Sequence, residues 1–447
     1  SIDNAKLTIA GAVSIAQSGT TIKVLSGTYI ENNPIILPEQ VSVVGDSLRE
    51  VTITPQNSGD IFYVTNGNYV SNVSFVGAAN TGAVIAFNPS GSGNITQSPY
   101  IQNCTNFIPN SVGVRVNGAH ASGDTKSIVV DSYTQYNQGG IGVSITNNGY
   151  AQLVSLFTIC NDIAIYCGSG GACDLTNSNS SFGNYGLVAD GVSNEQYVGV
   201  ITTPATANSS TFVVAGVGTN RPFDGQIVYF DDLYYEINKI TITNGGSNYT
   251  SAPTLTIDEP TTDWRIAAQA VTTVSNGVVT EIDIISSGRG YTTTPSITIA
   301  GGGGGSGLTL SLEIKPKYYV IQSATKPSAG ISTITITENL PYAVGVGTTV
   351  PFFKQSRILA SGHSFEYIGS GVTIATALPS TGGVSIQENE IDMRNGGLVV
   401  YTSTDQSGNF RIGDGVTINQ TTGDISGSAY TRSLYANVTP LILALGA

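Results

Sequence analysis

The stretch from Thr21 to Leu37, TIKVLSGTYIENNPIIL, contains three short runs of strand-forming residues separated by Ser-Gly and Asn-Asn-Pro turns. β-Branched and aromatic residues favour strands, whereas Gly, Asn and Pro favour turns. Ile22 and Val24 alternate with polar neighbours, so both side chains point to one face of an extended strand. The stretch therefore predicts short strands joined by tight turns.

The same alternation continues to about residue 190, between turns rich in Gly, Asn, Ser and Pro. The apolar sets are Val41/Val43, Val51/Ile53, Ile61/Tyr63, Val73/Phe75, Ile85/Phe87, Val112/Val114/Val116, Ile128/Val130, Ile141/Val143/Ile145, Val154/Leu156, Ile163/Ile165, Cys173/Leu175 and Val188. Many short, evenly spaced strands are typical of an antiparallel sandwich or a coiled solenoid. Two-residue Asn-Gly hairpin signals are infrequent, which favours a right-handed parallel β-helix.

A solenoid needs a cap over its first coil, because that coil would otherwise expose apolar surface and free strand edges. Residues 3–17 contain a helical stretch that could supply the cap, with Asp3 as its N-cap. The helix, Thr21–Val24, Gly27–Glu31 and Ile35–Leu37 together resemble the first coil of pectin-lyase-like β-helices. The resemblance covers residues 1–190 and implies the fold.

Past Gly191 the loops lengthen, and an internal repeat appears. ITITNGGSNYTSAPTLTI (240–257) aligns with IDIISSGRGYTTTPSITI (282–299). The sequence therefore predicts an all-β chain, a right-handed parallel β-helix followed by β-sandwich-like modules. Its predicted parts are a β-helix with an N-terminal capping helix (1–190), a β domain (191–360) carrying an inserted tandem β-repeat (240–314), and a C-terminal β domain (361–447).

The charge balance narrows the possible partners. Charged residues make up 11% of the chain, and 17 Lys+Arg stand against 30 Asp+Glu for a net charge of −13. No basic run is present to neutralise phosphates, so we expect no nucleic-acid binding. No apolar run approaches the roughly 18 residues of a membrane span, so we expect no membrane insertion. No sequence feature calls for a cofactor.

The pectin-lyase-like fold includes lyases, hydrolases and esterases, so the region before residue 191 could carry catalytic groups. Candidate acids are Asp124, Asp131, Asp162, Asp174 and Asp190, but sequence cannot show whether two of them converge. Arg49 and Arg115 are isolated there, and His120 and His363 form no recognisable triad. Cys104, Cys160, Cys167 and Cys173 lack zinc-site spacing and fit small buried hydrophobes. We therefore expect no catalytic residue, no metal site and no enzyme.

Binding residues are suggested at two places. Asp231 lies close to Tyr234 and Tyr235, and acids beside aromatics can bind sugars, although an ordinary turn and strand would look the same. Trp264, alone in the chain, could be a ligand platform or a core residue. Glu388, Glu390 and Asp392 could share a strand face, as cation ligands or as a solvated acidic edge.

Further stretches resemble virion structural proteins of T4-like marine cyanophages. They are Tyr150–Ser155, Ser180–Leu187, Ala360–Tyr367, Tyr401–Asp405 and Gly408–Asp414. The resemblance implies a virion protein of the phage tail, a fibre-like or baseplate appendage. Its implied partners are other tail or baseplate proteins and possibly a host cell-surface glycan, and its implied assembly is a homotrimer.

Two functions of different class remain open. One is a structural or host-adhesion component of the tail, and the other is a tailspike that depolymerises host envelope polysaccharide. Two acids that converge in a groove would favour the tailspike. Flat outer faces with unpaired acids would favour adhesion.

Overall fold

The computed structural model describes residues 5–91, 95–118, 126–218, 220, 222–223, 225–230, 235–261 and 265–366, and the backbone of strands β34 to β40 beyond them. Two compact units are present. One comprises residues 1–196 and 353–401, and the other comprises 197–352 and 402–447. Among the described residues, no helix is long and apolar enough to cross a membrane.

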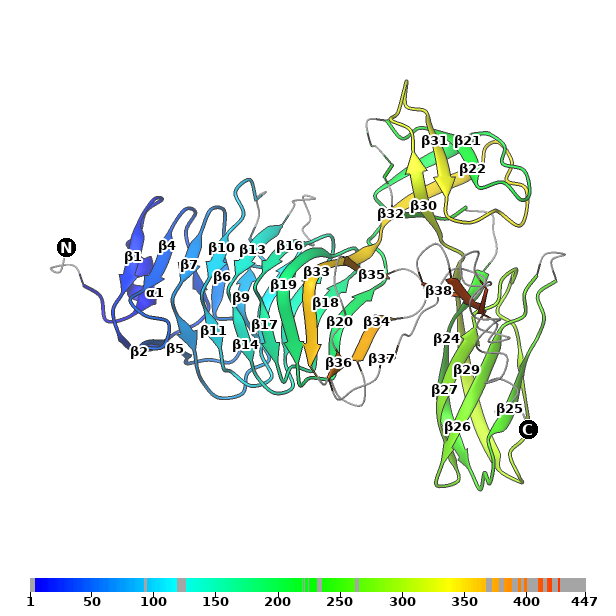
Figure 1. Cartoon of the computed structure of the whole chain (residues 1–447), viewed down its shortest axis with the longest axis horizontal. Coiled ribbons are helices and arrows are strands. Elements are labelled where there is room, and N and C mark those ends of the chain that lie inside the picture. Colours follow the sequence, from blue (N-terminus) through cyan, green and yellow to red (C-terminus); the bar gives the residue numbers. More distant parts are fainter. Residues whose placement is uncertain are drawn as a thin grey trace, which may run out of the picture. The chain divides into compact units, whose positions relative to one another are not determined.

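The first unit is a parallel β-helix, as Figure 1 shows. Each coil contributes three strands, and each strand pairs in parallel with its counterpart one coil later. The first strands are β1 (Thr21–Val24), β4 (Ser42–Gly45), β7 (Tyr69–Ser71), β10 (Tyr100–Gln102), β13 (Ser127–Asp131) and β16 (Tyr150–Val154). The second are β2 (Gly27–Glu31), β5 (Val51–Pro55), β8 (Ser74–Phe75), β11 (Thr105–Asn106), β14 (Thr134–Tyr136) and β17 (Phe157–Ile159). The long β19 (Ala172–Ser181) continues both series in one strand.

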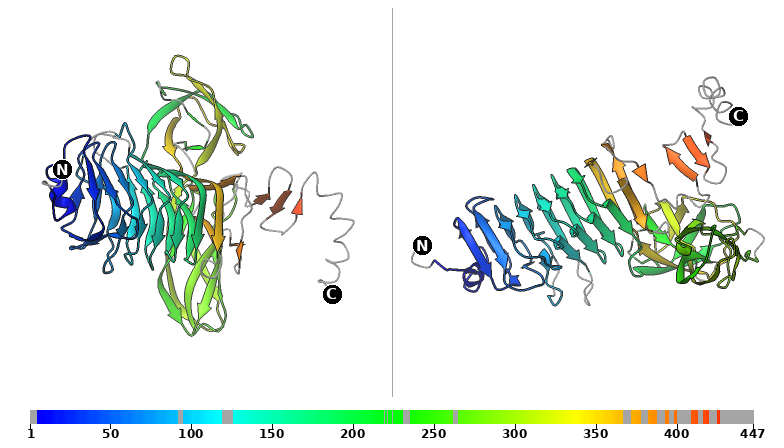
Figure 2. Two further views of the ribbon diagram at one scale, coloured as in Figure 1. Left: turned by 60° about the vertical axis from the view of Figure 1, so that its left-hand side comes forward. Right: turned by 90° about the horizontal axis from the view of Figure 1, so that it is seen from below.

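The third strands form a separate parallel sheet, and the stacked coils are seen from two other sides in Figure 2. They are β3 (Ile35–Ile36), β6 (Phe62–Val64), β9 (Ala83–Phe87), β12 (Val112–Asn117), β15 (Ile141–Thr146), β18 (Ile163–Gly168) and β20 (Tyr185–Asp190). The arrangement confirms the predicted all-β fold with a parallel β-helix. Parallel pairing from coil to coil also excludes the antiparallel sandwich for this region.

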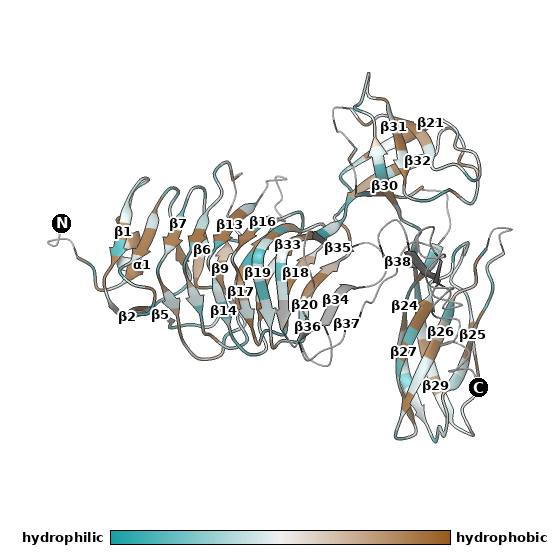
Figure 3. Ribbon diagram, viewed as in Figure 1, coloured by the Kyte–Doolittle hydropathy of each residue, from teal (hydrophilic) through white to brown (hydrophobic). Residues whose placement is uncertain are grey.

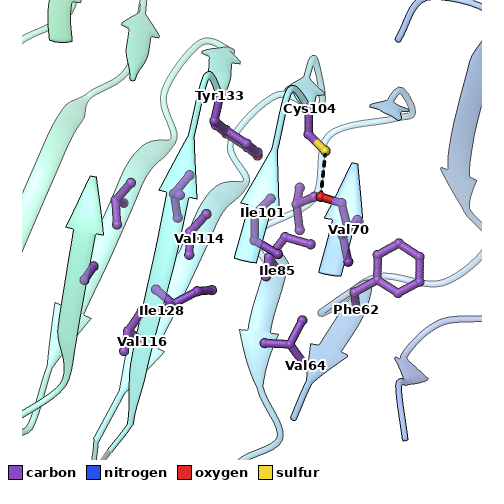
Figure 4. Packing of buried hydrophobic residues seen from close by; sticks show 14 of the residues in the cluster. Phe62, Val64, Val70, Ile85, Ile101, Cys104, Val114, Val116, Ile128 and Tyr133 are labelled. Atoms are coloured by element: carbon purple, nitrogen blue, oxygen red, sulfur yellow. Dashed lines mark hydrogen bonds between the residues drawn. The ribbon is translucent and has the colours of Figure 1, made fainter. Parts of the chain in front are cut away.

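Inward-facing residues of all three series build one continuous core, part of which Figure 4 shows. Phe62 packs edge-on against Phe75, and the Cys104 thiol donates to the Val70 carbonyl at 3.8 Å. In Figure 3 apolar residues recur on successive coils. Most of the predicted apolar sets are buried. Two predictions are shifted by one residue, since Phe62 and Val64 point inward instead of Tyr63, and Leu153 instead of Val154.

From the coil of β7 onward, the chain turns between the first and second strands through one residue with positive φ. These residues are Asn72, Asn103, Ser132, Ser155 and Asn177. A side chain with a Cβ is strained in this conformation, and Asn tolerates it best after Gly. The recurring turn keeps the coils in register, so that outward-facing side chains of neighbouring coils form rows.

The N-terminal cap is shorter than the predicted helix over 3–17. Helix α1 spans Ile9–Val13, and its N-cap is Thr8, whose side chain accepts a hydrogen bond from the Gly11 amide. Asp3, the predicted N-cap, lies outside the described residues. Glu31, fully buried, accepts hydrogen bonds from the Ile9 and Ala10 amides. A carboxylate at a helix N-terminus is favourable, so the first coil itself holds the cap.

The β-helix continues after a long excursion of the chain. Strand β33 (Ser356–Glu366) pairs in parallel with β19 over its whole length, and β34 (Val372–Ala377) pairs with β20. Strands β35 (Gly382–Gln387), β36 (Met393–Arg394) and β37 (Leu398–Val399) pair with these in turn. The predicted boundary at residue 360 therefore falls inside β33, because its apolar alternation continues the core of the helix.

In the second unit six strands close an antiparallel barrel around its own core. They are β21 (Tyr197–Thr203), β22 (Thr211–Ala215), β23 (Gln226–Val228), β30 (Tyr319–Ala324), β31 (Ser332–Ile336) and β32 (Thr349–Lys354). Closure removes free strand edges, which an open sandwich would leave. Strands β38 (Asn409–Ile412), β39 (Val416–Asn419) and β40 (Ile425–Ser426) form a small antiparallel sheet.

The internal repeat forms one module in which the two copies exchange strands. Its strands are β24 (Tyr235–Ser247), β25 (Pro253–Ile257), β26 (Gln269–Ser275), β27 (Val278–Ser286), β28 (Ile297–Gly301) and β29 (Ser306–Pro316). The first strand of each copy pairs with the third strand of the other, and the second strands pair together. Equivalent residues Thr256 and Thr298 face each other, which defines a local pseudo-twofold relation.

Candidate functional site

The first strands of the coils carry a row of aromatic, amide and carboxylate side chains on their outer surface. Their neighbours in sequence, such as Ile101 and Ala151, are buried in the core, so these side chains point away from it. All are partly exposed. We call this surface the tyrosine–carboxylate face, defined by Tyr69, Tyr100, Gln102, Asp131, Tyr150, Gln152 and Asp174.

The first cluster on this face spans β7, β10 and β13. Asp131 faces Gln102 in the strand register, and its Oδ2 accepts hydrogen bonds from the Tyr100 hydroxyl at 3.1 Å and Gln102 Nε2 at 3.0 Å. Gln102 Oε1 in turn accepts from the Tyr69 hydroxyl at 2.6 Å. The Tyr69 and Tyr100 rings lie 6.1 Å apart between centroids. Hydrogen bonds therefore fix the direction of every side chain in this cluster.

The second cluster spans β16 and β19. Asp174 faces Gln152 in the register, and its Oδ2 lies 2.8 Å from the Tyr150 hydroxyl. Gln152 Oε1 lies 3.0 Å from the same hydroxyl. One phenol can donate only one proton, so it chooses between the carboxylate and the amide. Either choice leaves the other oxygen free to accept a hydrogen bond from a ligand.

The phenols of Tyr100 and Tyr150 stay protonated in the ordinary pH range. Burial and then the hydrogen bond to Asp131 raise the pKa of Tyr100. Burial, followed by the hydrogen bond and the charge of Asp174, raises the pKa of Tyr150, and the charge of Arg357 opposes this increase. The face therefore presents neutral hydroxyl donors next to carboxylate acceptors. This is the chemistry that pairs with sugar hydroxyls, while the ring faces suit apolar sugar C–H surfaces.

The two carboxylates lie on the same face of the β-helix. Asp131 is in register with Val154 and Thr176, so Asp174 stands two strands further along the stack and two residues earlier in its strand. Strand spacing and rise then place the two Cα atoms about 12 Å apart. Asp174 leans toward β16, the strand between them, because it bonds to Tyr150 there. Asp131 leans toward β10 in the same way, because it bonds to Tyr100 and Gln102 there, so the two carboxyl groups stay about as far apart as their Cα atoms. This separation is wider than the ~5–5.5 Å of retaining pairs and the ~6.5–9.5 Å of inverting pairs.

Other charged groups of the β-helix are held by structural contacts. Arg115, isolated in the sequence, forms a two-pronged ion pair with Asp60, at 2.8 and 3.1 Å. Arg49 stacks over the Phe107 ring at 5.3 Å. His363 is buried in the core beside Ser180, and burial lowers its pKa to about 3. Among the described residues, no group of three or more His, Cys, Asp or Glu could hold a metal ion.

Of the binding candidates taken from the sequence, Tyr235 is the one that the structure describes. Asp231, Tyr234 and Trp264 fall outside the described residues, as do Asp124, His120 and the acids at 388, 390 and 392. Tyr235 begins β24, where its amide donates to the Tyr291 carbonyl, and its side chain packs on the repeat module's core. Tyr235 thus contributes to the packing of that module.

The acids found in the sequence divide between the face and a turn. Asp131 and Asp174 lie on the tyrosine–carboxylate face, whereas Asp162 lies on a turn and accepts from Asn184 Nδ2 at 2.7 Å. The side chain of Asp190 is not described. Sequence reasoning missed the tyrosines and glutamines beside the two acids. A usable signal was present, since Tyr100-Ile101-Gln102 and Tyr150-Ala151-Gln152 repeat one Tyr-x-Gln pattern.

No protein-family model matches the chain, and no curated protein matches it significantly. Solved structures do resemble it. An iota-carrageenase in complex with iota-carrageenan fragments is 19% identical, with a TM-score of 0.22, and the match covers 42% of this chain and 52% of that one. This chain therefore spans about half the length of the carrageenase.

Two further solved structures come from a phage and a bacterium. ORF18 of Geobacillus virus E2 is 11% identical, with a TM-score of 0.19, and the match covers 63% of this chain and 74% of that one. WceF of Pantoea stewartii, a glycan biofilm modifying enzyme with a bacteriophage tailspike-like parallel β-helix fold, is 10% identical with a TM-score of 0.22. That match covers 71% of this chain and 59% of WceF. At these identities the likeness concerns the fold and assigns no activity.

The prediction that the chain is not an enzyme has to be corrected. Solved β-helix structures similar to it include glycan-acting enzymes, the carrageenase and WceF among them. The prediction rested on the lack of a matched acid or arginine motif in the sequence. In a β-helix, groups on one face come from different coils, far apart in the chain, as Asp131 and Asp174 do. A missing local motif therefore says nothing against catalysis.

Proposed function

We propose that the chain is a bacteriophage tail appendage that binds a polysaccharide of the host envelope along the tyrosine–carboxylate face and hydrolyses it there. The observation that carries this proposal is the pair of hydrogen-bonded tyrosine, glutamine and aspartate clusters on one exposed face. Parallel coils extend this face across many strands, so it suits an extended polymer rather than a small molecule.

Hydrolysis would use the two carboxyl groups in opposite roles. One carboxylic acid donates its proton to the glycosidic oxygen as the C1–O bond breaks. The other carboxylate takes a proton from a water molecule, whose oxygen forms the new bond to C1. Asp131 and Asp174 are the residues proposed for these roles.

The place of the protein on the particle is part of the same proposal. The resemblance of Tyr150–Ser155 and four other stretches to virion proteins of T4-like marine cyanophages supports a tail or baseplate location. Tyr150 and Gln152 of that stretch belong to the second cluster, so the resemblance and the proposed site overlap. The predicted partners are other tail or baseplate proteins. The predicted assembly is a homotrimer.

The test uses the full chain and envelope polysaccharide extracted from candidate host cells. We expect the protein to bind the polysaccharide and release new reducing ends. Asp131→Asn and Asp174→Asn should each reduce the rate of release about 100-fold or more, far more than they weaken binding, because each removes one proton-transfer group. Asp162→Asn, an acid on a turn away from the face, is the matched control and should behave as wild type.

Two results would count against the proposal in different ways. Binding without any release of reducing ends would remove hydrolysis and leave the adhesive role. Release that survives both substitutions on the face would move the active site elsewhere in the chain.

A further inference from the structure

The two clusters on the tyrosine–carboxylate face are copies of one arrangement. In each, a tyrosine and a glutamine stand two residues apart on one strand, and an aspartate faces the glutamine on the next coil. The first copy is Tyr100, Gln102 and Asp131, and the second is Tyr150, Gln152 and Asp174. In both, the tyrosine hydroxyl lies within hydrogen-bond distance of the aspartate Oδ2. The two copies therefore offer a sugar the same three side chains in the same register, although the Gln102 amide donates to Asp131 whereas Gln152 Oε1 lies next to the Tyr150 hydroxyl.

The spacing of the copies follows from the coil stack. Gln152 is in register with Val129, which is in register with Tyr100, so the second copy is two strands further along and two residues earlier. Two strand spacings combined with this offset give about 12 Å between equivalent atoms. That spacing is comparable to the length of two linked sugars. It runs obliquely across the strands, from coil to coil.

The charge at each copy constrains what can bind. A carboxylate stands at the centre of each copy, and like charges at contact distance repel even under partial solvent screening. In the first copy, Asp131 accepts hydrogen bonds from the neutral groups of Tyr100, Gln102 and Ser132. Arg357 on β33 is in register with Ala172 and through it with Tyr150, so a cation lies next to the second copy. At the first copy an anionic sugar would meet a carboxylate bonded to neutral groups, and because successive repeats are alike, this disfavours an anionic repeat at both copies.

We infer that the face recognises a linear polysaccharide with a two-sugar repeating unit whose recognised sugars carry no carboxylate or sulfate, with successive repeats occupying the two copies. The inference rests on the proposed function and adds the substrate class to it. Hydroxyl and acetamido groups of neutral sugars supply the donors that the aspartate oxygens accept and the acceptors that the phenols need.

The test begins with envelope polysaccharide separated by anion exchange into neutral and anionic fractions. We expect the neutral fraction to bind at least tenfold more tightly than the anionic one. Oxidising the primary hydroxyls of the neutral fraction to carboxylates should remove this advantage. An anionic fraction that binds better, and loses binding in Gln102→Ala, would overturn the inference and leave the proposed function standing. Absence of binding to either fraction would contradict both the inference and the proposed function.

The second arm measures affinity against chain length, using neutral fragments of two to eight sugars. Gln102→Ala and Gln152→Ala should each lower the affinity for long fragments about tenfold, and the double variant should lower it about a hundredfold. Fragments of two sugars should lose little with either single change, since they can use the other copy. Thr176→Ala, an exposed residue on the same face outside both copies, is the control. Equal losses at every fragment length would contradict the two-copy arrangement.

All three glutamine variants must be compared at equal folded fraction. Gln102 and Gln152 are partly exposed, so their removal should leave the thermal unfolding midpoint within a few degrees of wild type. A variant that unfolds earlier would be replaced by Gln102→Glu or Gln152→Glu, which keeps the size of the side chain. Either substitution should also weaken binding of the neutral ligand, because it replaces the amide with a second carboxylate beside the aspartate.

Discussion

At the scale of single residues, the interior of the β-helix contains a polar row that is as ordered as its outer face. Asn106, Gln135, Thr158 and Ser180 occupy one register on successive coils, and all are buried. Asn106 donates to Gln135 at 3.0 Å, and Thr158 to Ser180 at 3.0 Å. Buried polar groups are tolerated when they bond to each other, and the stacking of coils supplies those partners.

His363, in register with Ser178, hydrogen-bonds to Ser180 of this row and gives a pH prediction. Its pKa in the folded chain is lowered to about 3 by burial, from 6.5 when exposed. Below pH 6.5 the unfolded chain takes up a proton that the folded chain refuses, so stability falls as pH falls. Each pH unit between the two values should cost about 1.4 kcal/mol.

Urea unfolding at pH 7 and pH 4 measures this effect. Wild type should lose more stability than His363→Gln, whose side chain can still bond to Ser180 and does not titrate. The carboxylates titrate alike in wild type and in His363→Gln, so the difference between their two losses of stability reports on His363 alone. Equal losses would mean that His363 is not buried as described.

How much the sequence could predict at this scale depends on whether a residue acts alone. Asp131 and Asp174 were found as acids, but their meaning depends on Gln102 and Gln152, which lie on neighbouring coils. The residues that lie beside a given strand position can be identified only once the register between strands is known. The Tyr-x-Gln repetition was visible, yet nothing in the sequence says that both copies share one face.

At the scale of elements, alternation predicted the strands of the β-helix well, because one buried face requires a period of two. The cap was predicted less well. Helix α1 keeps only five residues, Ile9–Val13, since Glu31 from the first coil fixes its start. The internal repeat was also visible, but an offset between two copies cannot show that they exchange strands. Pairing partners are chosen by tertiary packing rather than by local pattern.

The left-handed turn that recurs from the coil of β7 onward gives a stability prediction. Ser155 has a φ of 51°, in the left-handed region that glycine adopts without strain. Ser155→Gly should raise the free energy of unfolding by about 0.5–1 kcal/mol, since it relieves that strain. Ser144, an outward residue of β15 without this conformation, is the matched control. Ser144→Gly should lower stability by a similar amount.

Chemical denaturation of both variants decides the point. A loss of stability in Ser155→Gly would mean that its backbone does not adopt the left-handed turn, and would weaken the case for aligned rows on the outer face.

At the scale of the whole molecule, the feature that sequence could not supply is the return of the chain to its β-helix. Strand β33 follows the barrel and the repeat module in the sequence, and yet it pairs with β19. Residues 190 and 360 were natural boundaries by composition, yet β33 extends the same core. A long insertion costs little in loop-closure free energy, so local sequence carries no sign of where the helix resumes.

Assembly gives the prediction that belongs to this scale. The outer surface of the second strands exposes Phe107, Tyr136 and Phe157, each at least 36% accessible. Exposed apolar surface of this kind is commonly covered by a partner, and closed cyclic symmetry covers it without open growth. We expect a homotrimer, with a mass near three times 46.2 kDa in light scattering at micromolar concentration. A mass that stays at 46.2 kDa as concentration rises would contradict it.

The most direct test of the central claim is a crystal structure of the chain with a bound neutral oligosaccharide longer than one repeat. We predict sugar density across β10 to β19, running from coil to coil, with hydroxyl groups bonded to Asp131 and Asp174 and rings against Tyr100 and Tyr150. Sugar bound on another surface, with the tyrosine–carboxylate face empty, would contradict the claim.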